Sequence, residues 1–237
     1  VEDSTKIEQI KAGRVGAMLN IKGVKYTREM QNYAMQSRLR IPLLFGQDVI
    51  HGLRTIYPIP LGEAASFDLD LMERTAAGAA EEASAQGIHW TFAPMVDITR
   101  DARWGRVMEG AGEDTWYGSR VAEARVRGFQ GDDLADTHTV MACAKHFAAY
   151  GAAIAGKDYN TVDISDLTLH DTYLPPFRAA ANAGVATFMN SFNDINGIPA
   201  TGNAYIQRDI LKEGWAFSGF IVSDWGAIEQ LKNQGLA

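Results

Sequence analysis

Ionisable and amide side chains follow five apolar segments of this sequence, each at the point where the segment ends. The residues are Asp48, Asp97, Lys145 with His146, Asn190 with Ser191 and Asn193, and Asp224. Core packing alone does not choose charged residues repeatedly at such positions, because an unpaired buried charge is costly. If the segments are parallel strands, their ends meet on one face and form a site of carboxylates, cations and amides.

This combination suits a neutral polyhydroxylated ligand. Carboxylates accept hydrogen bonds from hydroxyls, Lys and Arg donate them, and Trp225 beside Asp224 offers a flat apolar face. A metal site fits less well, because the histidines at positions 51, 89, 138, 146 and 170 show no His-x-His spacing. The segment SDWGA is not a glycine-rich phosphate loop. We therefore expect neither a metal nor an organic cofactor.

The apolar segments alternate with helical patterns at intervals of tens of residues. Strand-like segments occupy residues 13–20, 41–48, 88–97, 139–147, 184–192 and 219–224. They lack strict polar alternation, which is typical of parallel strands covered on both faces. Helices are predicted to begin at residues that can act as caps or first-turn residues, namely Thr27, Asp68, Asp114, Asp166 and Asn203.

Repeated strand–helix units leave two architectures open, a (β/α)8 barrel and an open doubly wound sheet. A Rossmann-type sheet would show G-x-G-x-x-G after an early strand, and residues 13–20 do not supply it. The pattern therefore favours an α/β fold of the (β/α)8 TIM-barrel type, with its site at the carboxyl ends of the strands. Because about six strands are recognised where a barrel needs eight, we interpret residues 1–237 as an incomplete barrel.

Several of these residues also have simple structural explanations. For Asp97 and Asp114 we favour helix N-caps. Three histidines are expected to make local or structural hydrogen bonds, namely His51, His89 and His138. Ion pairs are expected between the acids Glu109, Glu113 and Asp114 and the cations Arg103, Arg106 and Lys145.

Composition excludes some classes of partner. The chain has 22 basic and 29 acidic residues, a net charge of −7, which disfavours nucleic acid and anionic membrane surfaces. No segment has the 18 or so uninterrupted apolar residues of a membrane span. The single cysteine, Cys143, lies in an apolar segment, so we expect a buried, inert thiol and no intrachain disulfide.

Seven motifs occur in a fixed order along the chain: QDVIHG, YPIPLGEAASFD, APMVDITRDARWGRVMEGAGED, KHFAAYG, DYNTVDIS, SFNDINGIPATGN and GFIVSDWGA. The ordered set resembles glycoside hydrolase family 3, close to its branch of bacterial periplasmic β-glucosidases. The resemblance covers almost the whole chain. The segment KHFAAYG departs from the K-H-F-P-G-H-G of the N-acetylglucosaminidase branch, so that activity is disfavoured.

The resemblance implies a role for individual residues. Asp224, in the S-D-W motif, takes the role of catalytic nucleophile. The residues implied to contact the sugar are Asp48, Arg103 as the first Arg of R-W-G-R, Lys145, His146 and, at the entrance, Trp225. Phe192 stands where some relatives carry Tyr, which removes a hydroxyl from the site.

The implied activity is that of a retaining, exo-acting β-glycosidase, foremost a β-glucosidase that releases terminal non-reducing β-D-glucosyl residues. Its substrate would be a β-linked gluco-oligosaccharide or an aryl or alkyl β-glucoside. The acid/base Glu is expected from a C-terminal α/β-sandwich domain outside residues 1–237, with Glu109 and Glu113 as in-chain alternatives. A β-xylosidase, a broad-specificity exo-glycosidase and a non-catalytic sugar-binding fragment stay open. The resemblance also implies a periplasmic or secreted protein.

Overall fold

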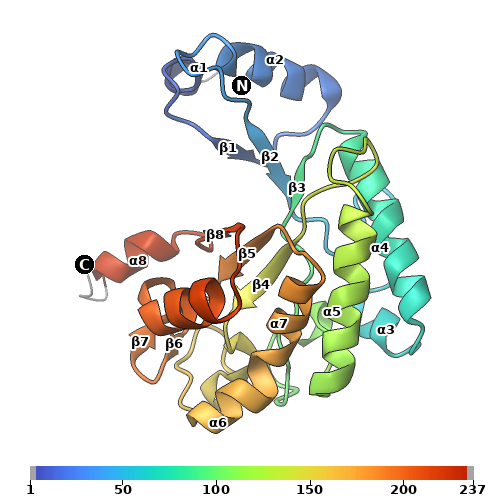
Figure 1. The fold of residues 1–237 in the computed structure, drawn as a ribbon, viewed down its shortest axis with the longest axis vertical. Coiled ribbons are helices and arrows are strands. Elements are labelled where there is room, and N and C mark those ends of the chain that lie inside the picture. Colours follow the sequence, from blue (N-terminus) through green and yellow to red (C-terminus); the bar gives the residue numbers. More distant parts are fainter. Residues whose placement is uncertain (1–3, 234–237) are drawn as a thin grey trace.

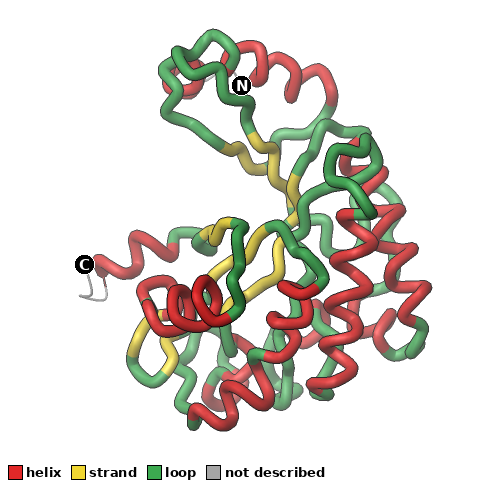
Figure 2. The backbone as a smooth tube through the Cα atoms, viewed as in Figure 1, coloured by secondary structure: helices red, strands yellow, loops and turns green. Residues whose placement is uncertain are grey.

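The computed structural model describes residues 4–233, in which six parallel strands form the centre and helices α4, α5 and α7 lie on one side of them (Figures 1 and 2). The parallel strands are β1 (Ala17–Leu19), β2 (Leu44–Gln47), β3 (Trp90–Thr91), β4 (Cys143–Phe147), β5 (Thr187–Asn190) and β8 (Phe220–Val222). A short antiparallel hairpin, β6 (Asp194–Ile195) and β7 (Ile198–Pro199), follows β5. Each predicted strand-like segment contains one of the parallel strands.

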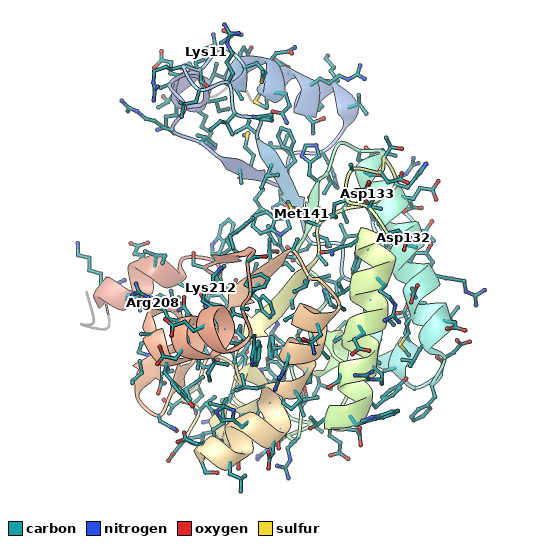
Figure 3. The ribbon with its side chains drawn as sticks, in the orientation of Figure 1. Lys11, Asp132, Asp133, Met141, Arg208 and Lys212 are labelled. Atoms are coloured by element: carbon teal, nitrogen blue, oxygen red, sulfur yellow. The ribbon has the colours of Figure 1, made fainter. Side chains whose placement is uncertain are left out.

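The parallel strands follow one another in chain order. They form two sheets, β1-β2-β3 and β4-β5-β8, and all pairings within these sheets are parallel. Two isolated parallel bridges, Trp90 with Met141 and Met95 with Lys145, connect β3 to the segment that enters β4. Met141 marks this junction in Figure 3. The carboxyl ends of all six strands are thus brought to the same side of the layer.

Helices connect the strands. The α-helices are α1 (Ser4–Lys11), α2 (Val24–Ala34), α3 (Pro60–Ala64), α4 (Leu69–Ser84), α5 (Thr115–Gln130), α6 (Asp166–Thr168), α7 (Pro175–Asn182) and α8 (Ala227–Asn233). The other helical segments are η1 (Val107–Glu109), η2 (Tyr150–Ala152), η3 (Ile154–Gly156), η4 (Leu169–Tyr173), η5 (Ala200–Gly202) and η6 (Tyr205–Gly214). Lys212, labelled in Figure 3, donates to the carbonyls of Phe217 and Gly219 and so ties η6 to the start of β8.

The largest core cluster lies between the strands and helices α4, α5 and α7. It contains Ala80, Val126, Phe147, Phe177 and Phe188, all of them buried. Helix α5 approaches α4 closely at a glycine, Gly128, where a Cβ would collide with the carbonyl of Glu73. These helices cover one face of β4 and β5 with the apolar core. The opposite face of the two strands can therefore carry polar side chains.

Side-chain caps account for most of the predicted helix starts. Asp68 accepts from the backbone N–H of Leu71, and Asp114 accepts from that of Tyr117. The cap at Asn203 is also confirmed, since its Oδ1 accepts from the N–H of Ile206, and α6 begins at Asp166 as predicted.

The predicted start at Thr27 is wrong. Helix α2 begins at Val24, after Gly23, whose positive φ of 96° is a conformation that glycine adopts without strain. Thr27 therefore lies within the helix, where its hydroxyl donates to the carbonyls of Gly23 and Val24.

The N-terminal helices pack on a smaller core of their own. Residues Ile10, Ala34, Leu43 and Phe45 form this cluster beneath α1 and α2, which stand apart from the other helices in Figure 1. Elsewhere Cys143 is buried and unpaired, as predicted. Within residues 4–233, no helix combines the length and the apolar character needed to cross a membrane.

Candidate active site

A cavity of about 660 Å³ lies at the carboxyl ends of the parallel strands. It collects five of the predicted site residues, namely Asp48, Lys145, His146, Asp224 and Trp225. They come from the ends of β2, β4 and β8, which are far apart in the sequence. A larger hollow of about 770 Å³ between α1, α2 and β1 contains none of the predicted site residues, so size alone does not identify the site.

Strand β4 supplies two charged or titratable side chains to the wall of the cavity. Lys145 and His146 are both buried, and the Nζ atom of Lys145 donates to Oδ1 of Asp48 at 3.3 Å. The carboxylate of Asp48 compensates the charge of Lys145, whereas its own side chain keeps 53% of its surface exposed. Asp48 can therefore accept further hydrogen bonds from a ligand.

Asp97 is not a helix N-cap, contrary to the prediction. Its Oδ2 atom accepts from the backbone N–H of His146 at 2.9 Å and lies 2.9 Å from the ring Nδ1 of the same residue. The chain after Asp97 continues as an irregular loop, and the carboxyl turns inward to pair buried donors that would otherwise lack partners. Burial raises the pKa of Asp97 to about 7, although the His146 N–H and the Arg106 charge oppose the shift.

Asp224 lies at the end of β8 with its carboxyl turned into the cavity. Its Oδ1 accepts from the backbone N–H of Trp225 at 2.6 Å. Its Oδ2 is buried 3.6 Å from Nε2 of His146 and has no hydrogen-bond partner among residues 4–233. Burial raises the pKa of Asp224, and the positive charges of Lys145 and Arg106 act against this increase.

The two arginines of the R-W-G-R motif have opposite surroundings. Arg103 has 72% of its side chain exposed and forms an ion pair with Asp101, so it lies outside the cavity. Arg106 lines the cavity and makes two hydrogen bonds to Glu109, at 2.7 and 2.9 Å. The predicted ion pair between Arg106 and Glu109 is confirmed, whereas Arg103 does not take the position expected of a sugar-binding residue.

The reason lies in the loop between β3 and η1. Arg103 is held by its own neighbour, because Asp101 accepts from both its backbone N–H and its guanidinium. Three residues later Arg106 precedes the short helix η1, whose Glu109 lies one turn away. The i,i+3 spacing of Arg106 and Glu109 is the signal in the sequence that distinguishes the second arginine.

The amide and hydroxyl residues after β5 lie behind the cavity rather than on its lining. Ser191 and Asn193 are buried and donate to the carbonyl of Ala148, and Asn193 also donates to Asp194. They support the backbone that follows Lys145 and His146. Both were noted in the sequence as strand-end residues, and in the structure they bind the backbone after β4 instead of lining the cavity.

The three histidines predicted to be structural make local contacts. The Nδ1 atom of His51 lies 2.9 Å from the carbonyl of Tyr57, within the loop that follows Asp48. His89 accepts from the backbone N–H of Phe45. His138 is exposed, 3.8 Å from a carboxylate oxygen of Glu81. In the described part of the chain, no group of three or more His, Cys, Asp or Glu residues is arranged to hold a metal ion.

Comparison with known proteins adds a family to this geometry. Residues 2–236 match the description "Glycosyl hydrolase family 3 N terminal domain". The chain belongs to glycosyl hydrolase family 3. It is 47% identical over 231 residues to a periplasmic beta-glucosidase of Salmonella typhimurium, covering 97% of this chain and 30% of that protein.

Two further proteins are similar over most of the chain. A putative beta-xylosidase of Formosa agariphila is 34% identical over 239 residues, covering 95% of this chain and 32% of that protein. The crystal structure of beta-glucosidase from Listeria innocua in complex with isofagomine superposes with a TM-score of 0.93 at 43% identity, covering 100% of this chain and 33% of that one. The chain thus spans about a third of the length of these relatives.

Aromatic side chains complete the family 3 cavity. Trp90, Phe92, Tyr159, Phe192 and Trp225 all line it, and the rings of Tyr159 and Phe192 lie 4.9 Å apart. Of these, the sequence pointed to Trp225 and to the absent hydroxyl at Phe192. Trp90, Phe92 and Tyr159 were not predicted, because the sequence does not distinguish an aromatic residue of the hydrophobic core from one that lines a cavity. The cavity therefore joins buried charged groups to an aromatic wall, which is a surface suited to a sugar ring.

Proposed function

We propose that this chain carries the nucleophile and the sugar-binding subsite of a retaining, exo-acting β-glycosidase, with a β-glucoside as preferred substrate. The observation that carries the proposal is the position of Asp224. Its side chain lines the cavity just beyond the end of β8 and is only 13% exposed, and its buried Oδ2 atom has no hydrogen-bond partner among the described residues. A binding module has no need of an unpaired buried carboxylate, whereas a nucleophile needs a free lone pair.

The surrounding charges fit the chemistry of the first displacement. Asp224 must be ionised to attack the anomeric carbon and form a glycosyl ester. Burial disfavours that charged form, and the nearby positive charges of Lys145 and Arg106 favour it. Asp48 and Lys145 would hydrogen-bond sugar hydroxyls, and the exposed Trp225 would stack on the aglycone or the next sugar.

The acid/base residue would come from elsewhere in the polypeptide. Asp48 and Asp224 are the carboxylates on the cavity lining, and Asp48 is already paired with Lys145. Both carboxylate oxygens of Glu109 accept from Arg106, and Glu113 lines a different hollow. We propose that a Glu of a C-terminal α/β-sandwich domain supplies the proton, and that residues 1–237 are part of a (β/α)8 barrel.

The relatives support a β-glucoside as substrate. Crystal structures of the beta-glucosidase from Listeria innocua contain isofagomine, glucose or, in a D270A mutant, laminaribiose. The similar protein of Salmonella typhimurium is a periplasmic beta-glucosidase, which supports a periplasmic or secreted location here. The second candidate is a β-xylosidase, favoured by the similarity to beta-xylosidases of Formosa agariphila.

Covalent labelling tests the nucleophile directly. A 2-deoxy-2-fluoro-β-glucosyl inactivator should add its glycosyl mass to the peptide that contains Asp224, in the full polypeptide to which this chain belongs. Asp224→Asn should abolish the label, and Asp209→Asn, an exposed carboxylate on η6, should leave it unchanged. Label on another residue, or the absence of any label in a protein that binds glucose, would contradict the proposal.

The choice between the two activities needs a separate measurement. We expect kcat/KM for p-nitrophenyl β-glucoside to exceed that for p-nitrophenyl β-xyloside by more than tenfold, a difference in transition-state binding of about 1.4 kcal/mol. The reverse order would identify a β-xylosidase without changing the role of Asp224.

A further inference from the structure

Three side chains form a line from the interior of the protein to the cavity. Asp97 lies behind His146, with its Oδ2 atom 2.9 Å from both the backbone nitrogen and the ring Nδ1 of His146. The other ring nitrogen, Nε2, lies 3.6 Å from Oδ2 of Asp224. Asp97 and His146 are almost fully buried, so water cannot replace either of them as the hydrogen-bond partner of the other.

The contact with Asp97 decides where the imidazole carries its proton. At a pH above the pKa of Asp97, about 7, its carboxyl is ionised and can only accept. It already accepts from the backbone N–H of His146, so the neutral ring donates to it from Nδ1. Nε2 then has a lone pair and faces the unpaired Oδ2 of Asp224 across 3.6 Å. Two acceptors that face each other do not bond, so Oδ2 of Asp224 receives no hydrogen bond from His146.

We propose that Asp97 is a positioning residue, which keeps the His146 proton on Nδ1 so that Nε2 does not donate to Oδ2 of Asp224 and the nucleophile keeps an unpaired oxygen. This inference rests on the proposed role of Asp224 as nucleophile. It also explains why the carboxyl of Asp97 is buried on the side of His146 that faces away from the cavity. Without Asp97 the ring could carry its proton on Nε2, donate to Asp224 and occupy the oxygen that the substrate needs.

The charges around the pair set the pH at which this arrangement fails. Burial lowers the pKa of His146, and the positive charges of Arg106 and Lys145 lower it further. Burial raises the pKa of Asp97 to about 7, opposed by Arg106 and supported by Glu109. On the cavity side Asp48 adds a negative charge near Asp224, and the ring of Tyr150 meets His146 edge-on.

Adding one more proton to the Asp97–His146 pair has one consequence, whichever residue takes it. If the ring gains it, Nε2 becomes a donor. If Asp97 gains it, its O–H can donate to Nδ1 and the ring proton moves to Nε2. In both cases Nε2–H points at Oδ2 of Asp224, so the nucleophile loses its free oxygen as the pH falls.

Nuclear magnetic resonance of 15N-histidine-labelled protein tests the tautomer without any turnover. In the full polypeptide at about pH 9, well above the pKa of Asp97, His146 should show a protonated Nδ1 and an unprotonated Nε2, with its signals assigned by their loss in His146→Gln. Free neutral histidine prefers the opposite tautomer, so this result would not arise by default. A protonated Nε2 at that pH would overturn the proposal, and labelling of a residue other than Asp224 would leave the tautomer result intact.

The pH profile of a matched pair of variants gives the second test. Asp97→Asn keeps a carbonyl oxygen for the two donors of His146 but removes the charge, so the pair gains its extra proton at lower pH. The acid limb of kcat/KM should move down by about one pH unit. Asp101→Asn, four residues along the same loop and paired with exposed Arg103, should leave the limb unchanged. An unshifted limb in Asp97→Asn, or an equal shift in Asp101→Asn, would contradict the proposal.

Discussion

The buried wall and the exposed rim of the cavity differ in what forms hydrogen bonds and contacts with their side chains. In the wall, Lys145 and His146 are buried, and each already has a protein partner, Asp48 for Lys145 and Asp97 behind His146. At the rim, the side chain of Asp48 is 53% exposed and Trp225 is 76% exposed. The wall is therefore organised before a ligand arrives, whereas the rim is completed by the ligand. Substitutions in the wall should slow the reaction, and substitutions at the rim should weaken binding.

The largest effect is expected at Asp224, where the wall meets the reacting sugar. Asp224→Asn keeps the shape of the side chain but cannot form the glycosyl ester. We expect kcat for p-nitrophenyl β-glucoside to fall on the order of 10⁴-fold or more, as for the loss of other nucleophiles. The thermal unfolding temperature should change little. Burial disfavours the charged form of Asp224, as its raised pKa shows, so a neutral amide of the same shape is no less stable there. Turnover within tenfold of the parent would remove Asp224 from the mechanism.

Arg106 should follow, because it is the arginine that lines the cavity. Arg106→Met removes a positive charge that favours ionised Asp224, and it leaves Glu109 without its bidentate partner. We expect a loss of about 10²–10³-fold in kcat/KM, comparable to removing one preorganised donor. Steady-state kinetics would check the value, and a loss smaller than threefold would show that the guanidinium does not act on the reacting groups.

The pH dependence offers a third test, with a sign opposite to that of Asp97→Asn. Asp224 must be ionised, so activity should fall as the pH decreases through its raised pKa, which lies above the ordinary value of 3.8. Lys145 favours the ionised form, and Lys145→Met should therefore move the acid limb to higher pH, by about one unit. Profiles of kcat/KM, each scaled to its own plateau, would show the shift. Movement to lower pH would contradict the charge assignment.

A smaller change is expected at the rim. Trp225→Ala removes an exposed aromatic face and leaves the buried wall intact. Loss of a stacking contact of about 1 kcal/mol corresponds to a rise in KM of about fivefold, with kcat within about threefold. A selective fall in kcat would instead place Trp225 among the residues that act on the transition state.

The smallest effect should come from Arg103, which makes Arg103→Ala the control for Arg106→Met. Its side chain is exposed and paired with Asp101, and an exposed ion pair contributes about 0–1 kcal/mol to stability. Activity should stay within about twofold of the parent. A hundredfold loss would mean that Arg103 turns into the cavity when substrate binds.

Much of this arrangement follows from the sequence, because strands and caps depend on local patterns. Each of the six apolar segments contains one of the six parallel strands. Asp68, Asp114 and Asn203 cap helices as predicted. Asp48 and Asp224 follow β2 and β8, and Lys145 lies in the second half of β4, so they meet because the carboxyl ends of parallel strands share one face. Resemblance to family 3 supplied roles that the spacing alone did not.

The loop between β3 and η1 is where the structure departs most from the sequence-based expectations. Asp97 was expected to cap a helix, and the structure buries it against His146 instead. Arg103 stays a predicted sugar contact, although its side chain lies outside the cavity and Arg106 lines it. An irregular loop has no periodicity, so the sequence alone determined which side chains it offers but not which way they turn. Only the tertiary structure decided that, because the buried donors of His146, contributed by a strand about fifty residues away, select the one carboxyl that can reach them.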